Sequence, residues 1–186
     1  KHSVGLLCDY LIANNLIPDI LIHNLGGKLE DDNHPISLEI LRKTLQLNLE
    51  ISIEINNCLI AHMIEKKNCS IIHISSDSSI TGNASPCYVI AKSSLNAYVL
   101  NLAGKLSDCG IFIHAFLLGP FIYHNSYWFN LKYTNPTKYK NKLKSLTNKK
   151  FFEARVLAEI IFKFSTSGKQ YTYNPLIFIN SEGGIK

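Results

Sequence analysis

The chain has 186 residues, of which 46% are hydrophobic and 18% charged, a composition typical of a globular rather than a disordered protein. Its net charge of +5 comes largely from one lysine-rich stretch, so we do not expect a nucleic-acid surface. No apolar run reaches membrane-spanning length, so we expect no membrane association.

The five cysteines and seven histidines are scattered along the chain. No two cysteines have the CxxC spacing, and their odd number argues against a disulfide framework, so we expect reduced thiols and a cytoplasmic location. The histidines form no HxxxH or HExxH pair, and we therefore expect no metal site.

The first part of the chain predicts a helix, a strand and a second helix. Residues 4–12 have the apolar spacing of an amphipathic helix, and residues 20–23 form the short apolar run of a buried parallel strand. This strand runs into the glycine-bearing turn Asn24-Leu25-Gly26-Gly27. Ser37 is the expected N-cap of a long helix over residues 38–66.

The second part continues the alternation. The pattern predicts, in order, a strand at 69–75, a helix at 86–106, a strand at 111–117, a helix at 152–164 and a strand at 176–179. Strand–helix alternation predicts an α/β fold, with a doubly wound parallel sheet between two layers of helices.

Residues 122–150 are aromatic and lysine-rich, with only broken helical patterning. Long insertions are often lids or binding loops, so we expect a lid-like insertion within a single domain covering residues 1–186. Its aromatic residues could line a substrate pocket or serve plain packing. Its lysines could attract an anionic substrate or form a solvated helical face.

Ligands of such sheets gather at the carboxyl ends of the strands. The helix that opens at Ser85-Pro86 starts on that same rim and carries Tyr88 and Lys92 four residues apart, on one face. An ammonium beside a phenol lowers its pKa, so the pair is a plausible proton-transfer device. An isolated Y-x-x-x-K is more often incidental, but here independent features converge on one rim.

Five motifs, in order along nearly the whole chain, resemble those of the short-chain dehydrogenase/reductase family. They are the strand motif Asp19–Gly26, the serine-bearing strand end Ile74–Ser76, the Tyr88–Lys92 motif, the turn Gly119–Phe121 and the ending Ser181–Gly184. The resemblance implies a Rossmann-like fold.

The resemblance also implies a function: hydride transfer between NAD or NADP and a small carbonyl or alcohol substrate. The implied catalytic residues are Asn48, Ser76, Tyr88 and Lys92. Tyr88 would exchange the proton, Lys92 would lower its pKa and bind the nicotinamide ribose, the serine would orient the carbonyl, and Asn48 would hold a relay water. The implied cofactor contacts are Asn24, Gly26, Tyr88, Lys92, Gly119 and Phe121. A homodimer or homotetramer through helices 38–66 and 86–106 is implied as well.

Some residues depart from the family pattern. His23 replaces an asparagine and Leu25 replaces a small alanine. The catalytic serine is ambiguous, because the usual spacing to Tyr88 points to Ser75 whereas the register of the following glycine loop points to Ser76. Ser76 is our preferred assignment.

The largest departure is that no G-x-x-x-G-x-G turn occurs in the sequence. That turn holds the cofactor pyrophosphate in dinucleotide-binding folds. We therefore expect an N-terminally truncated domain, an unpaired apolar edge at strand 20–23, and weak cofactor binding by this chain alone. The alternative function is a non-catalytic scaffold or an inactive fragment. Neither the substrate nor the choice between NAD and NADP can be read from the sequence.

Overall fold

The computed structural model describes residues 2–146, 149–166 and 174–179. Its helices are α1 (His2–Ala13), α2 (Leu38–Leu45), η1 (Gln46–Glu50), α3 (Ile51–Lys66), α4 (Ser78–Thr81), α5 (Pro86–Ser107), α6 (Tyr127–Thr134), α7 (Pro136–Ser145) and α8 (Ala154–Thr166). Its strands are β1 (Ile20–His23), β2 (Cys69–Ser76), β3 (Ile111–Leu118), β4 (Phe121–Ile122), β5 (Phe152–Glu153) and β6 (Leu176–Ile179). Residues 181–184, which the sequence analysis compared with a family motif, lie outside the described residues.

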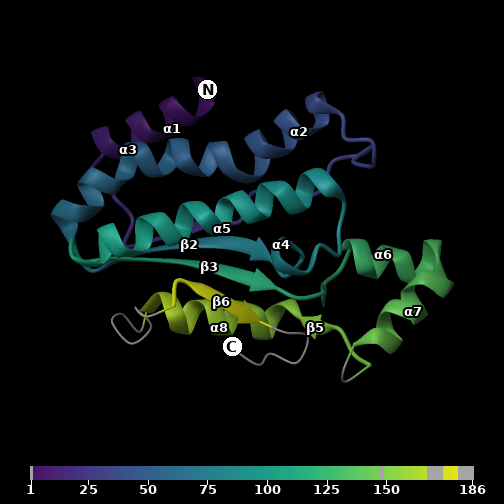
Figure 1. The fold of residues 1–186 in the computed structure, drawn as a ribbon. Coiled ribbons are helices and arrows are strands. Elements are labelled where there is room, and N and C mark those ends of the chain that lie inside the picture. Colours follow the sequence, from purple (N-terminus) through teal and green to yellow (C-terminus); the bar gives the residue numbers. More distant parts are fainter. Residues whose placement is uncertain (1, 147–148, 167–173, 180–186) are drawn as a thin grey trace.

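A parallel sheet with strand order β1-β2-β3-β6 forms the middle layer. Figure 1 shows α5, α3 and α1 above this sheet and α8 below it. The α/β class and the parallel sheet with helices on both faces were predicted from the sequence and are confirmed. The small second sheet, in which β4 pairs with β5, was not predicted.

Alternate residues of the strands form two separate hydrophobic clusters, one on each face of the sheet. Ile71 of β2 packs with Leu59 of α3 and Val99 of α5. Ile72, the next residue, faces the other way and packs with Leu157 and related side chains of α8. This explains why the strands read as continuous apolar runs, since both of their faces are buried.

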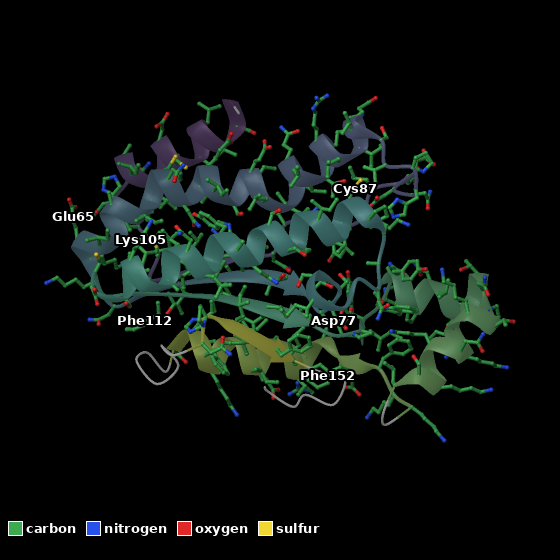
Figure 2. The ribbon with its side chains drawn as sticks, viewed as in Figure 1. Glu65, Asp77, Cys87, Lys105, Phe112 and Phe152 are labelled. Carbon is green, nitrogen blue, oxygen red and sulfur yellow. The ribbon has the colours of Figure 1, made fainter. Side chains whose placement is uncertain are left out.

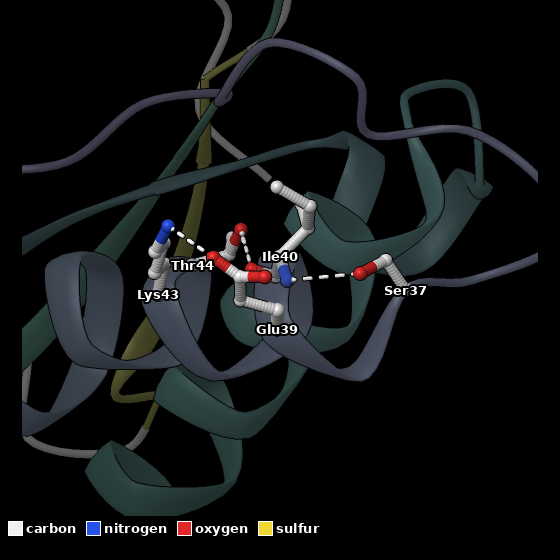
Figure 3. Close-up of polar contacts among 5 residues, drawn as sticks. All are labelled: Ser37, Glu39, Ile40, Lys43 and Thr44. Atoms are coloured by element: carbon white, nitrogen blue, oxygen red, sulfur yellow. Dashed lines mark hydrogen bonds and ion pairs between the residues drawn. The ribbon is translucent and has the colours of Figure 1, made fainter.

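The long helix predicted over residues 38–66 contains a π-helical turn, η1, between α2 and α3. There the Ile51 N–H donates to the Gln46 carbonyl, one residue further back than in an α-helix. Its start was predicted correctly, because the Ser37 hydroxyl accepts a hydrogen bond from the Ile40 N–H at 3.4 Å. Figure 3 shows this cap together with the Thr44 hydroxyl, which donates to the Ile40 carbonyl.

Within the described residues, β1 pairs with β2 alone and forms one edge of the sheet. Its Ile22 is 47% exposed, which confirms the predicted apolar edge. A groove of about 190 Å³ runs along this strand between α1 and α3. Its lining is mostly leucine and isoleucine, for example Leu7, Leu21 and Ile51.

The insertion at 122–150 contains α6 and α7, which pack against each other beside the carboxyl ends of β2 and β3 (Figure 1). Asparagine and serine side chains cap both helices: Ser126 accepts from the Phe129 N–H, and Asn135 accepts from the Lys138 N–H. Across the described ranges, no helix has the length and apolar character needed to cross a membrane.

Candidate active site

The strand ends named in the sequence analysis and the start of α5 lie at one end of the molecule. Figure 2 places Asp77, next to the end of β2, and Cys87, in the first turn of α5, at the same end as α6. Glu65 and Lys105 lie at the opposite end.

Asn48 is buried in the π-turn and fastened to the loop that follows β1. Its Oδ1 accepts the Gly27 N–H at 2.9 Å, and its Nδ2 donates to the Gly27 carbonyl at 3.0 Å and to the Thr44 carbonyl at 3.0 Å. Both side-chain N–H groups are thus engaged within the protein. The Asn48 side chain therefore holds the turn after β1, and the relay-water role that the resemblance implied stays a prediction.

Gly26 joins Asn48 to Lys92. A Cβ at Gly26 would lie 2.6 Å from Asn48 Oδ1 and 3.1 Å from Lys92 Nζ, and the backbone φ of +149° is one that other residues rarely adopt. Only glycine therefore lets the turn after β1 approach both side chains so closely. The structure brings three of the predicted residues, Gly26, Asn48 and Lys92, into one contact group.

Lys92 is 4% exposed, and its Nζ donates to the Ile74 carbonyl of β2 at 2.8 Å. Burial lowers the pKa of Lys92 to about 8, because the charged form loses its hydration. The ammonium lies 5.8 Å from the centre of the Tyr88 ring. A buried lysine with a lowered pKa beside a tyrosine is typical of functional sites.

Tyr88 differs from the prediction in the direction of its pKa. Burial raises this pKa, and the nearby Asp77 carboxylate raises it further, whereas a hydrogen bond with the Ser76 hydroxyl acts in the opposite direction. The net direction is thus upward, whereas the sequence analysis expected the ammonium of Lys92 to lower this pKa. Tyr88 is accordingly a neutral phenol at neutral pH.

The two candidate serines have different partners. The Ser75 hydroxyl is buried and donates to Asn96 Oδ1 of α5 at 2.7 Å. The Ser76 hydroxyl pairs with the Ser78 hydroxyl at 2.8 Å and lies close enough to Tyr88 to lower the pKa of its phenol. The contact with Tyr88 is the feature that favours Ser76 over Ser75.

The other residues predicted to contact the cofactor, Asn24, Gly119 and Phe121, lie at the same rim. Gly119 and Phe121 make contacts with other strands there. Asn24 is exposed at the end of β1 and lines the edge groove. The Gly119 N–H donates to the Ile179 carbonyl at 2.9 Å, which extends the pairing of β3 with β6. Phe121 pairs with Phe152 of the small sheet and stacks on Tyr123.

A buried polar network beneath the rim was not predicted. His23 Nε2 contacts Asn56 Oδ1 at 2.8 Å, and Asn56 Nδ2 contacts Tyr98 Oη at 3.0 Å and His73 Nε2 at 3.3 Å. The two imidazole rings stack with their centres 4.5 Å apart. Burial lowers the pKa of both histidines, so this cluster is neutral at pH 7.

Asp32 is the second residue that the sequence analysis missed. It lies in the loop between β1 and α2 and is completely buried, with its carboxylate on the backbone of the first turn of α5. Ser85, the predicted N-cap of α5, occupies the cap position but makes no side-chain capping bond. An aspartate in a polar loop gives no local signal that it caps a helix turn 55 residues later.

The insertion reaches this rim through α7. Burial raises the pKa of Asp77, and the Lys142 ammonium opposes this rise, which places Lys142 near the end of β2. Lys142 also lies 5.6 Å from the Trp128 ring, and Trp128 packs on Phe151. Of the alternatives left open for these aromatic residues, the contacts support packing for Trp128. The described residues contain no group of three or more potential metal ligands.

The chain is similar in sequence and in fold to known dehydrogenases and reductases. The short chain dehydrogenase family profile matches residues 14–122. L-sorbose reductase from Gluconobacter frateurii, solved with NADPH and L-sorbose, is 18% identical, with a TM-score of 0.82 over 97% of this chain and 72% of that chain. 4-Hydroxyisoleucine dehydrogenase, solved with NADH, is 17% identical, with a TM-score of 0.78 over 98% and 77%.

A short chain dehydrogenase from Leptospira borgpetersenii with bound NAD+ is 16% identical, with a TM-score of 0.77 over 96% of this chain and 69% of that chain. No curated protein matches the sequence. At these identities the structural likeness shows the fold.

Proposed function

The chain belongs to the short-chain dehydrogenase family, and from that premise we propose that it carries the proton-transfer centre of an NAD- or NADP-dependent oxidoreductase. The reaction is hydride transfer between the nicotinamide and a small carbonyl or alcohol substrate. The observation that carries the proposal is the grouping of Tyr88, Ser76 and the buried Lys92 at one rim of the sheet.

Tyr88 acts as the acid in carbonyl reduction, because its raised pKa keeps the phenol protonated at neutral pH. The Ser76 hydroxyl, which lies close to this phenol, holds the substrate oxygen beside it. Lys92 places a positive charge where negative charge develops on that oxygen. In alcohol oxidation the proton moves in the opposite direction. When bound, the cofactor supplies or accepts the hydride.

The described residues fit the nicotinamide end of the cofactor. Lys92 presents a buried cation, and the turn at Gly26 approaches it so closely that no side chain fits between them. We assign the nicotinamide ribose to Lys92 and Tyr88, with Asn24, Gly26, Gly119 and Phe121 nearby on the rim. The pyrophosphate has no counterpart, because the sequence contains no glycine-rich turn of the dinucleotide-binding type.

The test is the substitution Tyr88→Phe in the full protein. Turnover should fall at least about 10²-fold, the usual loss when a general acid is removed, with the fold unchanged by circular dichroism. Tyr133→Phe, at an exposed tyrosine, is the matched control. Wild-type turnover in Tyr88→Phe would refute the assignment and favour the alternative, a non-catalytic scaffold of the same family.

A second pair of variants separates the serines. Ser76→Ala should lower turnover, because it removes the hydroxyl that contacts Tyr88. Ser75→Ala should leave turnover near wild type and reduce stability by about 1 kcal/mol, the usual worth of a lost hydrogen bond. The reverse pattern would assign the catalytic role to Ser75.

The proposal includes an assembly and a location. We propose a homodimer or homotetramer formed through α3 and α5, supported by the exposed Ile90 and Leu100 on α5. All five cysteines are free thiols, which agrees with a cytoplasmic protein.

The segment 122–150 is proposed as a lid over the rim. Sedimentation of the full protein tests the assembly, and a monomer at all concentrations would contradict it.

A further inference from the structure

Asp32 holds the first turn of the helix that carries Tyr88. Its Oδ1 accepts the Cys87 N–H at 2.8 Å and its Oδ2 accepts the Tyr88 N–H at 3.0 Å. These two N–H groups belong to the first turn of α5 and have no partner inside the helix. The carboxylate thus bonds to the backbone of the proposed catalytic residue itself.

The charge state of Asp32 fits this arrangement. Burial alone would raise its pKa, but the hydrogen bonds that it accepts outweigh this and lower the pKa below the ordinary value. The positive end of the helix dipole acts in the same direction. Asp32 is therefore a buried carboxylate anion at neutral pH, and losing one of its partners would leave an uncompensated charge in the interior.

The loop that carries Asp32 is fastened at a second point, closer to β1. There Gly27 exchanges two hydrogen bonds with Asn48 of the π-turn, while Gly26 lies against Lys92. The loop therefore connects η1, the turn after β1 and the start of α5. A shift of the loop at one of these points therefore acts on the others through the hydrogen bonds of the buried Asn48 and Asp32 side chains.

We propose that Asp32 is a positioning residue for Tyr88, which fixes the first turn of α5 so that the phenol stays beside Ser76 and Lys92. Its catalytic consequence rests on the proposed function, whereas its effect on the position of Tyr88 does not. Displacement of a reacting group by about 1 Å can lower a rate by roughly 10²-fold. Because the Asp32 carboxylate belongs to a different loop, it fixes the position of the first turn of α5 relative to that loop and also caps the helix.

The test is Asp32→Asn, with the exposed neighbour Asp31→Asn as the matched control for the change in charge. The first readout is the pKa of the Tyr88 phenol, from ultraviolet difference titration against Tyr88→Phe. In Asp32→Asn this pKa should fall toward the ordinary value of about 10, because a displaced phenol is less buried. The second readout is kinetic: kcat should fall roughly tenfold or more while KM changes less than twofold. Asp31→Asn should match wild type in both.

The double variant Asp32→Asn with Ser85→Asp distinguishes the positioning of Tyr88 from simple capping of α5. It also provides a testable protein if Asp32→Asn alone folds poorly. An aspartate at the N-cap can satisfy the same N–H groups from within the helix. Under the proposal, the thermal midpoint recovers in the double variant but the Tyr88 pKa and kcat do not. Recovery of all three, or a wild-type Tyr88 pKa in Asp32→Asn, would overturn the positioning role. If Tyr88→Phe shows that the protein is not an oxidoreductase, the Tyr88 pKa in Asp32→Asn still tests whether Asp32 positions Tyr88.

Discussion

At the scale of single residues, the role proposed for Lys92 and its effect on stability oppose each other. It is a cation in the interior, with one hydrogen bond to the Ile74 carbonyl and no carboxylate partner among the ion pairs of the described residues. Its pKa of about 8 means that the folded state binds this proton more weakly than the unfolded chain does. Lys92 therefore reduces the free energy of unfolding below pH 8, and this cost disappears as the pH rises toward 10.5.

Lys92→Met should stabilise the chain at pH 7. The difference between 10.5 and about 8 corresponds to roughly 3 kcal/mol, from which the lost hydrogen bond removes about 1 kcal/mol. We expect a net gain of about 2 kcal/mol in urea denaturation at pH 7 that shrinks by pH 9.5, together with loss of activity. A variant less stable than wild type at pH 7 would show that interactions of the Lys92 ammonium in the folded protein outweigh the cost of burying its charge.

Gly26→Ala and Gly27→Ala form a matched pair, since both glycines have φ near +150° but only Gly26 has atoms within reach of a new Cβ. Both variants should lose stability from backbone strain, roughly 1–3 kcal/mol. Gly26→Ala should lose about 1–3 kcal/mol more, because its Cβ collides with Asn48 and Lys92. Chemical denaturation of the two variants measures the difference in their free energies of unfolding. Equal losses would mean that the Asn48 and Lys92 side chains move aside for the new Cβ at little cost.

At the scale of helices and strands, the buried pair of β1 and β2 histidines makes stability depend on pH. His73 is fully buried and its pKa is well below the ordinary 6.5, so the folded protein keeps it neutral while the unfolded chain takes up a proton. Stability should therefore fall as the pH drops below 6.5, by up to about 1.4 kcal/mol per pH unit for each such histidine. His23, whose pKa is lowered too, contributes in the same direction.

His73→Phe should flatten this dependence. Asn56 keeps its bond to Tyr98 in the variant, and a phenyl ring can still lie against His23. Urea denaturation at pH 7, 6 and 5 should show about one proton less taken up on unfolding than in wild type. An unchanged slope would mean that His73 becomes charged in the folded protein.

The elements themselves were largely readable from the sequence, because buried parallel strands and amphipathic helices leave local patterns. β2, α5, β3 and β6 lie within a residue of their predicted bounds. What could not be read were features made by contacts between distant residues, such as the clamp of Asp32 on α5 and the histidine pair. The π-turn at Asn48 was missed for a related reason, since its sequence fits an α-helix and its shape follows from the bonds of Asn48 to Gly27.

At the scale of the whole molecule, the proposed site provides for only one end of a dinucleotide. We expect the 186-residue chain to bind NADH or NADPH weakly, because nothing in its sequence offers a glycine-rich pyrophosphate turn. Fluorescence titration measures this, with the L-sorbose reductase of Gluconobacter frateurii, solved with NADPH, as the positive control. Micromolar affinity would show that this chain holds the pyrophosphate by other means.

The parallel order of the sheet also determines how this chain has to fold. Ile20 of β1 pairs with Ser70, Cys69 of β2 with Ile111, and Ala115 of β3 with Leu176, so every neighbouring pair joins residues dozens of positions apart. No hairpin of this sheet can form from adjacent sequence, and each pairing has to close a long loop before it gains any stability. The speed with which the sheet assembles is therefore limited by its connections, and the helices, whose contacts are local, are expected to form ahead of it.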